Sequence, residues 1–273
     1  MESNYFYNFK EDIEIVKVVI LAGGYGTRIR DVSSDIPKPM IPIGPYPILW
    51  HIMKIYSKYG YNDFVICLGY KGHVIKDFFL NYMPYVRDLT INLGDGSVQY
   101  HSQHDEENWK VTLVNTGIGS MTGSRISKIR SYIGSSPFMF TYGDGVSDID
   151  INELVKFHQN HDKILTVTGV QMPGRFGEMI GEDNGMITGF KEKPQASSKS
   201  RISGGFFVAN PELFNYLSDD ESLVFEQEPM NTLVSNHEMM MYPHNGFWQP
   251  MDSSREYQLL NKLYESGDAL WLS

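Results

Sequence analysis

Three glycines and an arginine lie close together in the segment Leu21–Arg28, whose sequence is LAGGYGTR. Glycines at positions 23, 24 and 26 allow the backbone to adopt positive φ and leave room for a ligand against the main chain. Successive N–H groups in such a turn accept anions, and Arg28 adds a planar charge suited to phosphate oxygens. The spacing fits neither the GxGxxG dinucleotide fingerprint nor the GxxxxGK phosphate loop of ATPases. We therefore predict a phosphate-binding loop, with a purely structural turn as the alternative.

Lys38 follows this loop within the motif Pro37-Lys-Pro-Met40. The two flanking prolines hold the backbone extended and determine where the lysine side chain points. Taken alone, the motif favours a solvated lysine in a stiff loop. The nearby glycine loop favours a lysine that meets the same phosphate groups.

The elements that must position these residues alternate between strands and helices. Helical patterns run over residues 47–60, 73–82, 151–161 and from about 252 to 267. Met239–Met241 is interpreted as part of a strand, and short apolar runs predict further, fully buried strands at Lys17–Ala22, Phe64–Leu68, Phe138–Thr141, Ile164–Thr168 and Gly205–Val208. The alternation predicts an α/β fold with a Rossmann-like, mostly parallel mixed sheet flanked by helices. Ligands of such sheets bind beyond the carboxyl ends of the strands.

Two segments depart from this pattern. Residues 1–16 are polar and aromatic and are interpreted as an extension before the first strand. From about Gln171 onward the strands become shorter and the turns are rich in glycine and proline, which predicts a second, smaller lobe.

LAGGYGTR followed by PKPM resembles the sugar-phosphate nucleotidyltransferases, which join a nucleoside triphosphate to a sugar 1-phosphate and release pyrophosphate. Within that family, further stretches in the same order resemble the glucose-1-phosphate cytidylyltransferases. These stretches are Pro47–His51, Leu68–Gly72, Phe140–Gly145, Gly174–Gly177, Gly204–Val208, Glu226–Pro229 and Gly246–Asp252. The resemblance implies a nucleotidyltransferase domain over residues 17–273, with a nucleotide-binding part at about 17–150 and a sugar-binding lobe with a closing helix at about 151–273. It also implies the formation of CDP-glucose from CTP and glucose 1-phosphate, for surface-glycan or deoxysugar synthesis.

The resemblance assigns roles to individual residues. Arg28 and Lys38 would act on the reacting phosphates as catalytic residues, with Thr27 helping to grip them. The remaining nucleotide-binding residues would be Leu21, Ala22, Gly23, Gly24, Tyr25, Gly26, Ser120, Arg125 and Gly143.

Metal and sugar ligands are implied in the same way. Asp144 and Asp252 would bind Mg²⁺, which needs one or two carboxylates plus phosphate oxygens. From the residues alone, Asp144 could equally be a turn residue between two glycines, and Asp252 the N-cap of the last helix. Glu192 would meet the sugar hydroxyls and Lys193 the sugar phosphate, although a surface turn is the alternative for both. The other implied sugar-phosphate contacts are Gly177 and Gly204.

Composition excludes several classes of protein. With 23 Lys and Arg against 33 Asp and Glu, the formal charge of −10 argues against a nucleic-acid binder. The single cysteine, Cys67, excludes an internal disulfide and a cysteine-based zinc site. We find neither a signal-peptide pattern nor an apolar run long enough to cross a membrane, and expect a cytoplasmic protein. The family resemblance implies a homo-oligomer.

Some positions depart from the pattern of close relatives. Asn115 stands where they carry aspartate, Ser203 stands where they carry asparagine, and Pro45-Tyr46 replaces a Gly-Lys pair. None of these changes touches the phosphate or metal residues, so the activity class is better supported than the sugar. Another base or acceptor, and a non-catalytic sugar-nucleotide sensor on the same fold, remain alternatives. A dinucleotide oxidoreductase is disfavoured by the missing GxGxxG fingerprint.

Overall fold

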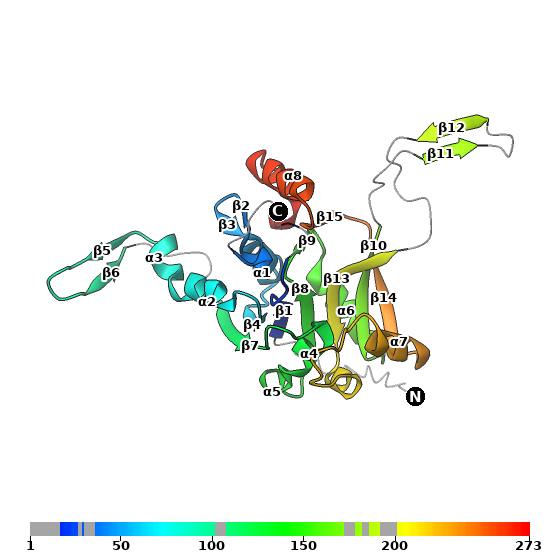
Figure 1. Ribbon diagram of the computed structural model, residues 1–273, viewed down its shortest axis with the longest axis horizontal. Coiled ribbons are helices and arrows are strands. Elements are labelled where there is room, and N and C mark those ends of the chain that lie inside the picture. Colours follow the sequence, from blue (N-terminus) through cyan, green and yellow to red (C-terminus); the bar gives the residue numbers. More distant parts are fainter. Residues whose placement is uncertain are drawn as a thin grey trace, which may run out of the picture.

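A seven-stranded sheet forms the centre of the molecule, with strand order β14-β10-β13-β8-β1-β4-β7 (Figure 1). The computed structural model describes residues 17–26, 29, 36–101, 108–171, 178–181, 186–191 and 201–273. The sheet strands are β1 (Lys17–Leu21), β4 (Asp63–Leu68), β7 (Lys110–Asn115), β8 (Phe138–Tyr142), β10 (Leu165–Val170), β13 (Ile202–Ala209) and β14 (Met239–His244). β13 runs antiparallel to both of its neighbours, whereas the other neighbouring pairs are parallel. The predicted α/β fold with a mostly parallel mixed sheet is confirmed.

The central strands are buried on both faces, as their continuous apolar runs predict. In β1, Val18 and Ile20 point into one hydrophobic cluster, and Val19 and Leu21 point into another. This alternation follows from the two-residue period of a strand, which sends successive side chains to opposite faces. The sheet therefore separates two cores.

Helices cover both faces of the sheet. Side chains of α1 (Ile48–Ser57), α2 (Gly72–Leu80), α6 (Ile151–Gln159) and α8 (Ser254–Glu265) contribute to the first cluster. Side chains of α4 (Thr122–Ser127), α5 (Arg130–Ile133), the 3₁₀ helix η3 (Pro211–Tyr216) and α7 (Glu228–Ser235) contribute to the second. A short helix, α3 (Tyr82–Val86), follows α2. The helices predicted from the sequence are present, with ends that differ by a few residues.

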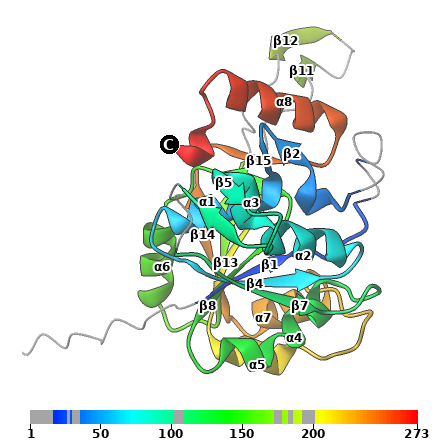
Figure 2. The ribbon, with the colours of Figure 1, turned by 90° about the vertical axis from the view of Figure 1, so that its left-hand side faces the viewer.

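Four two-stranded hairpins or ribbons lie outside the main sheet. They are β2 (Pro42–Ile43) with β3 (Tyr46–Pro47), β5 (Leu89–Ile91) with β6 (Val98–Tyr100), β9 (Gly145–Ser147) with β15 (Trp248–Pro250), and β11 (Glu178–Gly181) with β12 (Ile187–Lys191). Figure 1 shows the β5–β6 hairpin projecting from the body, and Figure 2 shows α8 beside β2 at one end of the molecule. Among the described residues, no helix is long and apolar enough to cross a membrane.

The start of α8 has a reciprocal capping arrangement. Ser253 is the N-cap, and its side chain accepts a hydrogen bond from the Glu256 N–H. Glu256 in turn accepts a hydrogen bond from the backbone N–H of Asp252 at 2.7 Å. The Ser253 side chain thus satisfies one N–H group of the first helical turn, and the Glu256 side chain reaches back to the residue before the N-cap. The Asp252 side chain is therefore not used as the cap, contrary to one of its two sequence interpretations.

The C-terminus is held against α1 by a buried histidine. The indole N–H of Trp271, in the 3₁₀ helix η4 (Leu270–Leu272), donates to His51 Nδ1 at 3.1 Å. The other ring nitrogen of His51 lies 2.9 Å from the carbonyl oxygen of Ile43 and must donate to it. Because both positions are used by a neutral ring in the dry core, burial lowers the pKa of His51 from 6.5 to about 4.

We expect the buried His51 to make stability depend on pH. Its folded pKa lies below its unfolded value, so its contribution is present above about pH 6.5 and is lost as pH falls toward 4. Between pH 7.5 and pH 5 the wild type should lose about 2 kcal/mol more unfolding free energy than His51→Gln, which cannot take up the proton. Urea denaturation at the two pH values measures the difference. His73→Gln removes an exposed histidine and should keep the pH dependence of the wild-type unfolding free energy. If His51→Gln loses as much unfolding free energy as the wild type, His51 does not cause the pH dependence.

Candidate active site

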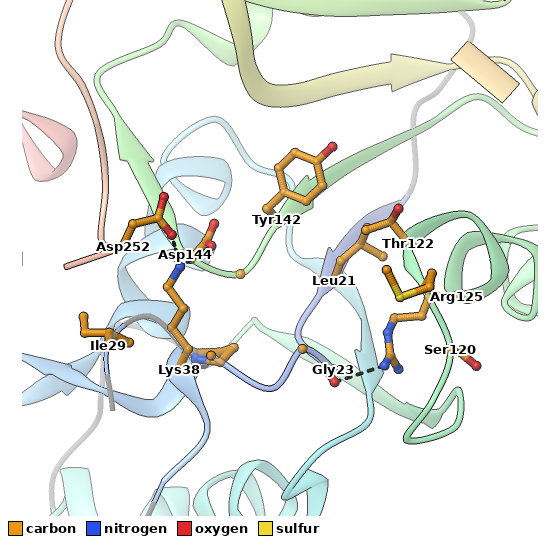
Figure 3. A pocket seen from close by; sticks show the side chains of 15 residues that line it. Leu21, Gly23, Ile29, Lys38, Ser120, Thr122, Arg125, Tyr142, Asp144 and Asp252 are labelled. Atoms are coloured by element: carbon orange, nitrogen blue, oxygen red, sulfur yellow. Dashed lines mark hydrogen bonds and ion pairs between the residues drawn. The ribbon is translucent and has the colours of Figure 1, made fainter. Parts of the chain in front are cut away.

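A cavity of about 370 Å³ opens where β1 and β8 end. This is the carboxyl edge of the parallel strands, where the fold class predicts a ligand site. Figure 3 shows the cavity with its lining side chains. They belong to Leu21, Gly23, Gly24, Gly26, Ile29, Lys38, Pro39, Ser120, Met121, Thr122, Arg125, Tyr142, Gly143, Asp144 and Asp252.

Most described residues that the sequence analysis assigned to the nucleotide or the metal line this one cavity. Ala22 is buried behind it, and Tyr25 is exposed with its ring 5.2 Å from that of Tyr70. Gly204 lies on β13 outside the lining. Thr27, Arg28, Gly177, Glu192 and Lys193 lie outside the described residues.

The glycine loop follows β1 and packs tightly against two cationic residues. A Cβ atom at position 23 would lie 2.2 Å from the guanidinium of Arg125, and one at position 26 would lie 2.9 Å from Lys38 Cβ. Gly26 also has φ of +60°, which favours glycine. A Cβ at Gly24 would meet nothing within 4 Å. Glycines 23 and 26 thus let the loop approach its neighbours, and Gly24 leaves space beside the backbone.

Arg125 holds the glycine loop to the segment after β7. Its guanidinium donates to the carbonyl oxygens of Gly23, Leu68, Gly117 and Ile118 and to the hydroxyl of Thr116 at 2.7–3.4 Å. The side chain is buried, with 4% exposed. Its donors are therefore engaged with the protein at the rim of the cavity. The sequence assigned Arg125 to the nucleotide and gave no sign of these carbonyl partners.

Lys38, Asp144 and Asp252 form an ionic cluster at the other end of the cavity. Lys38 Nζ lies 2.6 Å from Asp144 Oδ2 and 2.6 Å from Asp252 Oδ1. The lysine side chain is 12% exposed and each carboxylate 35%. Burial by itself lowers the pKa of Lys38, but the charges and hydrogen bonds of both aspartates outweigh it and raise that pKa above its usual value. The lysine therefore stays protonated.

A short 3₁₀ helix and the pairing of two strands far apart in the sequence position these three residues. Lys38 begins the 3₁₀ helix η2 (Lys38–Met40), which is closed by bonds from Met40 N–H to Pro37 O and from Ile41 N–H to Lys38 O. The two aspartates are joined by the β9–β15 pairing, in which Gly145 lies opposite Pro250. Beyond this pair, the N–H of Met251 donates to the carbonyl oxygen of Asp144 at 2.8 Å. Asp252 follows immediately and faces the same cation.

The two carboxylates fit a divalent cation that takes its remaining ligands from a substrate. They already converge on one cationic atom, the nitrogen of Lys38. Within the part of the chain that the structure describes, no group of three or more His, Cys, Asp or Glu side chains could hold a metal by itself. A hard cation such as Mg²⁺ needs only one or two carboxylates when phosphate oxygens and water complete its coordination. The donor set therefore suits a metal that binds together with a phosphorylated ligand.

A hydroxyl pair on the cavity wall was not found from the sequence. Tyr142 and Thr122 both line the cavity, and both hydroxyls donate to the carboxylate of Glu226, that of Thr122 at 2.7 Å. Burial and the charge of Glu226 raise the pKa of Tyr142, so its hydroxyl stays protonated as a donor. Glu226 belongs to the Glu226–Pro229 motif, but nothing in that motif indicated its partners.

A side chain of β15 holds the backbone of Gly204. The indole N–H of Trp248 donates to the Gly204 carbonyl oxygen at 2.7 Å. The next residue, Gly205, has φ of +79°, and a Cβ there would lie 2.7 Å from the ring of Tyr142. The glycine pair therefore lets β13 pass close to the cavity wall.

Comparison with known proteins identifies the family. Residues 17–251 match the sequence model of the nucleotidyl transferase family. This chain belongs to that family. It is 46% identical over 257 residues to a glucose-1-phosphate cytidylyltransferase of Salmonella typhi, with 94% of this chain and 98% of the relative covered. It is 43% identical to a probable glucose-1-phosphate cytidylyltransferase of Bacillus subtilis, with 94% and 99% covered.

A solved structure shares the fold of this chain. A UDP-glucose pyrophosphorylase complexed with UDP-glucose superposes with a TM-score of 0.66 at 18% identity, covering 93% of this chain and 100% of that one. At this level of identity the likeness concerns the architecture alone. The family match over residues 17–251 and the identity to the two cytidylyltransferases confirm the resemblance of the sequence motifs to the nucleotidyltransferases.

We expect Lys38→Met to lower the unfolding free energy by roughly 1–3 kcal/mol, because it leaves two half-buried carboxylates facing each other without a counter-ion. A divalent cation can replace the ammonium group between them, so Mg²⁺ should raise the melting temperature of this variant more than that of the wild type. Thermal unfolding with and without millimolar Mg²⁺ measures both effects. Lys110→Met is the matched control, since Lys110 is 72% exposed in its pair with Asp63. Identical Mg²⁺ effects on all three proteins would contradict a cation site at the aspartates.

Proposed function

We propose that this protein transfers the cytidylyl group of CTP to glucose 1-phosphate, forming CDP-glucose and releasing pyrophosphate. The observation that carries the proposal is the convergence of Lys38, Asp144 and Asp252 at a glycine-lined cavity. The chain around that cluster is 46% identical to a glucose-1-phosphate cytidylyltransferase over nearly its whole length. Both the geometry and the family favour the same reaction.

The reaction is a displacement at the α-phosphorus of the nucleotide. An oxygen of the sugar phosphate forms the new bond to phosphorus, and the bond to the leaving pyrophosphate breaks. Such a transfer depends on alignment and on neutralising negative charge more than on acid–base groups. The cavity has the corresponding parts, because it combines open backbone at Gly24 with a protonated lysine and two carboxylates.

We assign separate roles in phosphate binding and in charge stabilisation to residues of this chain. The backbone of Gly23, Gly24 and Gly26 would receive the nucleotide phosphates, with Thr27 and Arg28 assigned to the same phosphates from the sequence motif. Lys38 would place a positive charge at the reacting phosphates, where negative charge develops in the transition state.

Asp144 and Asp252 would hold Mg²⁺ as its protein ligands. When bound, the ion neutralises phosphate charge and orients the phosphate oxygens. The β9–β15 pairing brings the two aspartates together, and both carboxylates already face one cationic group, the Lys38 ammonium. Gly143 allows the chain just before Asp144 to pass close to β1, since a Cβ there would lie 3.0 Å from the Leu21 carbonyl oxygen.

We assign the sugar phosphate to Glu192 and Lys193 with Gly177 and Gly204, as the sequence motifs suggest. Ser203 and the Pro45-Tyr46 change leave open another acceptor than glucose 1-phosphate. A non-catalytic sensor on the same fold is the second candidate function. It would have no need of a lysine buried between two carboxylates beside the phosphate loop, and that cluster is present.

We expect Asp144→Asn and Asp252→Asn each to lower kcat/KM by roughly 100-fold or more, because an amide oxygen is a much weaker ligand for Mg²⁺ than a carboxylate. Pyrophosphate release at varied Mg²⁺ concentration measures the loss, and circular dichroism checks that both variants fold. Asp95→Asn, in the exposed loop between β5 and β6, should behave as the wild type. Near-normal rates in both active-site variants would refute the metal assignment.

The proposed substrates are tested by offering CTP, UTP, dTTP and GTP with a panel of sugar 1-phosphates. We expect the highest kcat/KM for CTP with glucose 1-phosphate. A site that hydrogen-bonds a polar group of one base can reject the analogue lacking it by orders of magnitude. A CTP-to-UTP ratio near or below one would overturn the cytidylyl assignment, and an absence of pyrophosphate release with every pair would favour the sensor.

A further inference from the structure

The turn Thr116–Met121 forms one end of the cavity, opposite the ionic cluster of Lys38. Ser120 and Met121 of this turn line the cavity (Figure 3). Its first three carbonyl groups all point to cationic side chains. Those of Gly117 and Ile118 accept from Arg125, and that of Thr116 accepts from Lys128.

Lys128 connects the two ends of the turn. It follows directly after α4, and its Nζ donates to Thr116 O at 3.1 Å and to Ser120 Oγ at 2.8 Å. The Ser120 hydroxyl itself donates to Thr116 O at 2.6 Å. Lys128 is 25% exposed, so these bonds lie largely away from water. A charged donor that bridges two positions of one turn restricts the conformation of the turn more than a single bond does.

The glycines of the turn leave the space in which the Lys128 side chain reaches Thr116 and Ser120. Gly117 has φ of +99°, and a Cβ there would lie 2.9 Å from Ser120 Oγ and 3.5 Å from Lys128 Nζ. A side chain at either position 117 or 119 would also approach the carboxylate of Glu221, at 3.2 Å. The turn is therefore built around the position of the lysine ammonium group.

The carbonyl groups of Thr116, Gly117 and Ile118 are thus occupied, while N–H groups of the turn keep their capacity to donate. The N–H groups of Ile118, Gly119 and Ser120 donate to none of the residues that the structure describes. A fixed N–H donor beside a pyrimidine can bond to N3 of cytosine, which is an acceptor. It cannot bond to N3 of uracil, which carries a hydrogen.

We propose that Lys128 is a positioning residue for nucleotide selection: it holds the Thr116–Met121 turn so that its N–H groups favour cytosine over uracil. The inference rests on the proposed cytidylyl transfer and adds a residue that no motif of the sequence singled out. Lys128 does not touch the reacting phosphates, which lie at the end of the cavity occupied by Lys38. Its effect is therefore on the base and not on the chemical step.

The test is steady-state kinetics of Lys128→Met with CTP and with UTP. We expect the KM for CTP to rise about 10-fold and the CTP-to-UTP ratio of kcat/KM to fall by a similar factor. The kcat with CTP and the KM for glucose 1-phosphate should stay within about twofold of the wild type, because the ionic cluster is untouched. A variant that is merely destabilised would lose activity with both nucleotides alike, and an unchanged ratio would overturn the proposal.

Three further variants keep the test decisive if Lys128→Met folds poorly. Lys128→Arg retains a charged donor and should restore most of the CTP preference. Ser120→Ala removes one of the two partners of Lys128 and should lower the preference in the same direction. Glu221→Gln is the matched control, since Glu221 is 64% exposed and 3.6 Å from Lys128, and should behave as the wild type.

The outcomes separate this inference from the proposed function. If the wild type prefers CTP and Lys128→Met prefers it equally, the inference fails and the cytidylyl assignment stands. If the wild type shows no preference for CTP, the assignment fails. The inference about Lys128 then fails with it, because it explains that preference.

Discussion

The ammonium group of Lys38 is shared by two carboxylates, and much of the molecule serves to bring these three charges together. In the chain, Lys38 is 106 residues from Asp144 and 214 from Asp252. Two half-buried carboxylates side by side repel each other and would take up a proton unless a cation lies between them. The fold must therefore deliver a lysine and two aspartates from three separate segments to one point. The central sheet, η2 and the β9–β15 pairing are the elements that do this.

The last helix contributes to the site although its own side chains do not line the cavity. Ser253 caps α8 and Glu256 binds the backbone N–H of Asp252, which leaves the Asp252 carboxylate to the Lys38 ammonium group. The chain after α8 then returns to α1, where Trp271 bonds to His51. These contacts stabilise the segment that carries Asp252. Packing in the first hydrophobic cluster is thus connected to the geometry of the ionic cluster.

Features that depend on neighbouring residues could be predicted from the sequence, whereas features that depend on contacts between distant segments could not. β1, β4 and β8 are continuous apolar runs and were predicted correctly, whereas β7 mixes Lys110, Thr112 and Asn115 with apolar residues and was missed. The glycine loop and Lys38 were recognised because adjacent residues carry their signal. The meeting of Asp144 with Asp252 was implied by family resemblance, since it arises from the pairing of strands far apart in the chain. Neither the carbonyl partners of Arg125 nor the bonds of Lys128 follow a sequence period, and both depend on the tertiary path.

Charged side chains stabilise both ends of the cavity, but the signs of the charges differ. Carboxylates surround a cation at one end, and cations bind backbone carbonyl groups at the other. At the ionic end, two negative side chains hold the Lys38 ammonium group. At the turn end, the cationic side chains Arg125 and Lys128 bind backbone carbonyl groups. The segment Asp219–Glu226 secures this second end, because Met121 N–H donates to Glu221 O and Thr122 donates to Glu226. Residues late in the chain therefore complete both ends of a cavity that opens where β1 and β8 end, so its geometry depends on segments that are far apart in the sequence.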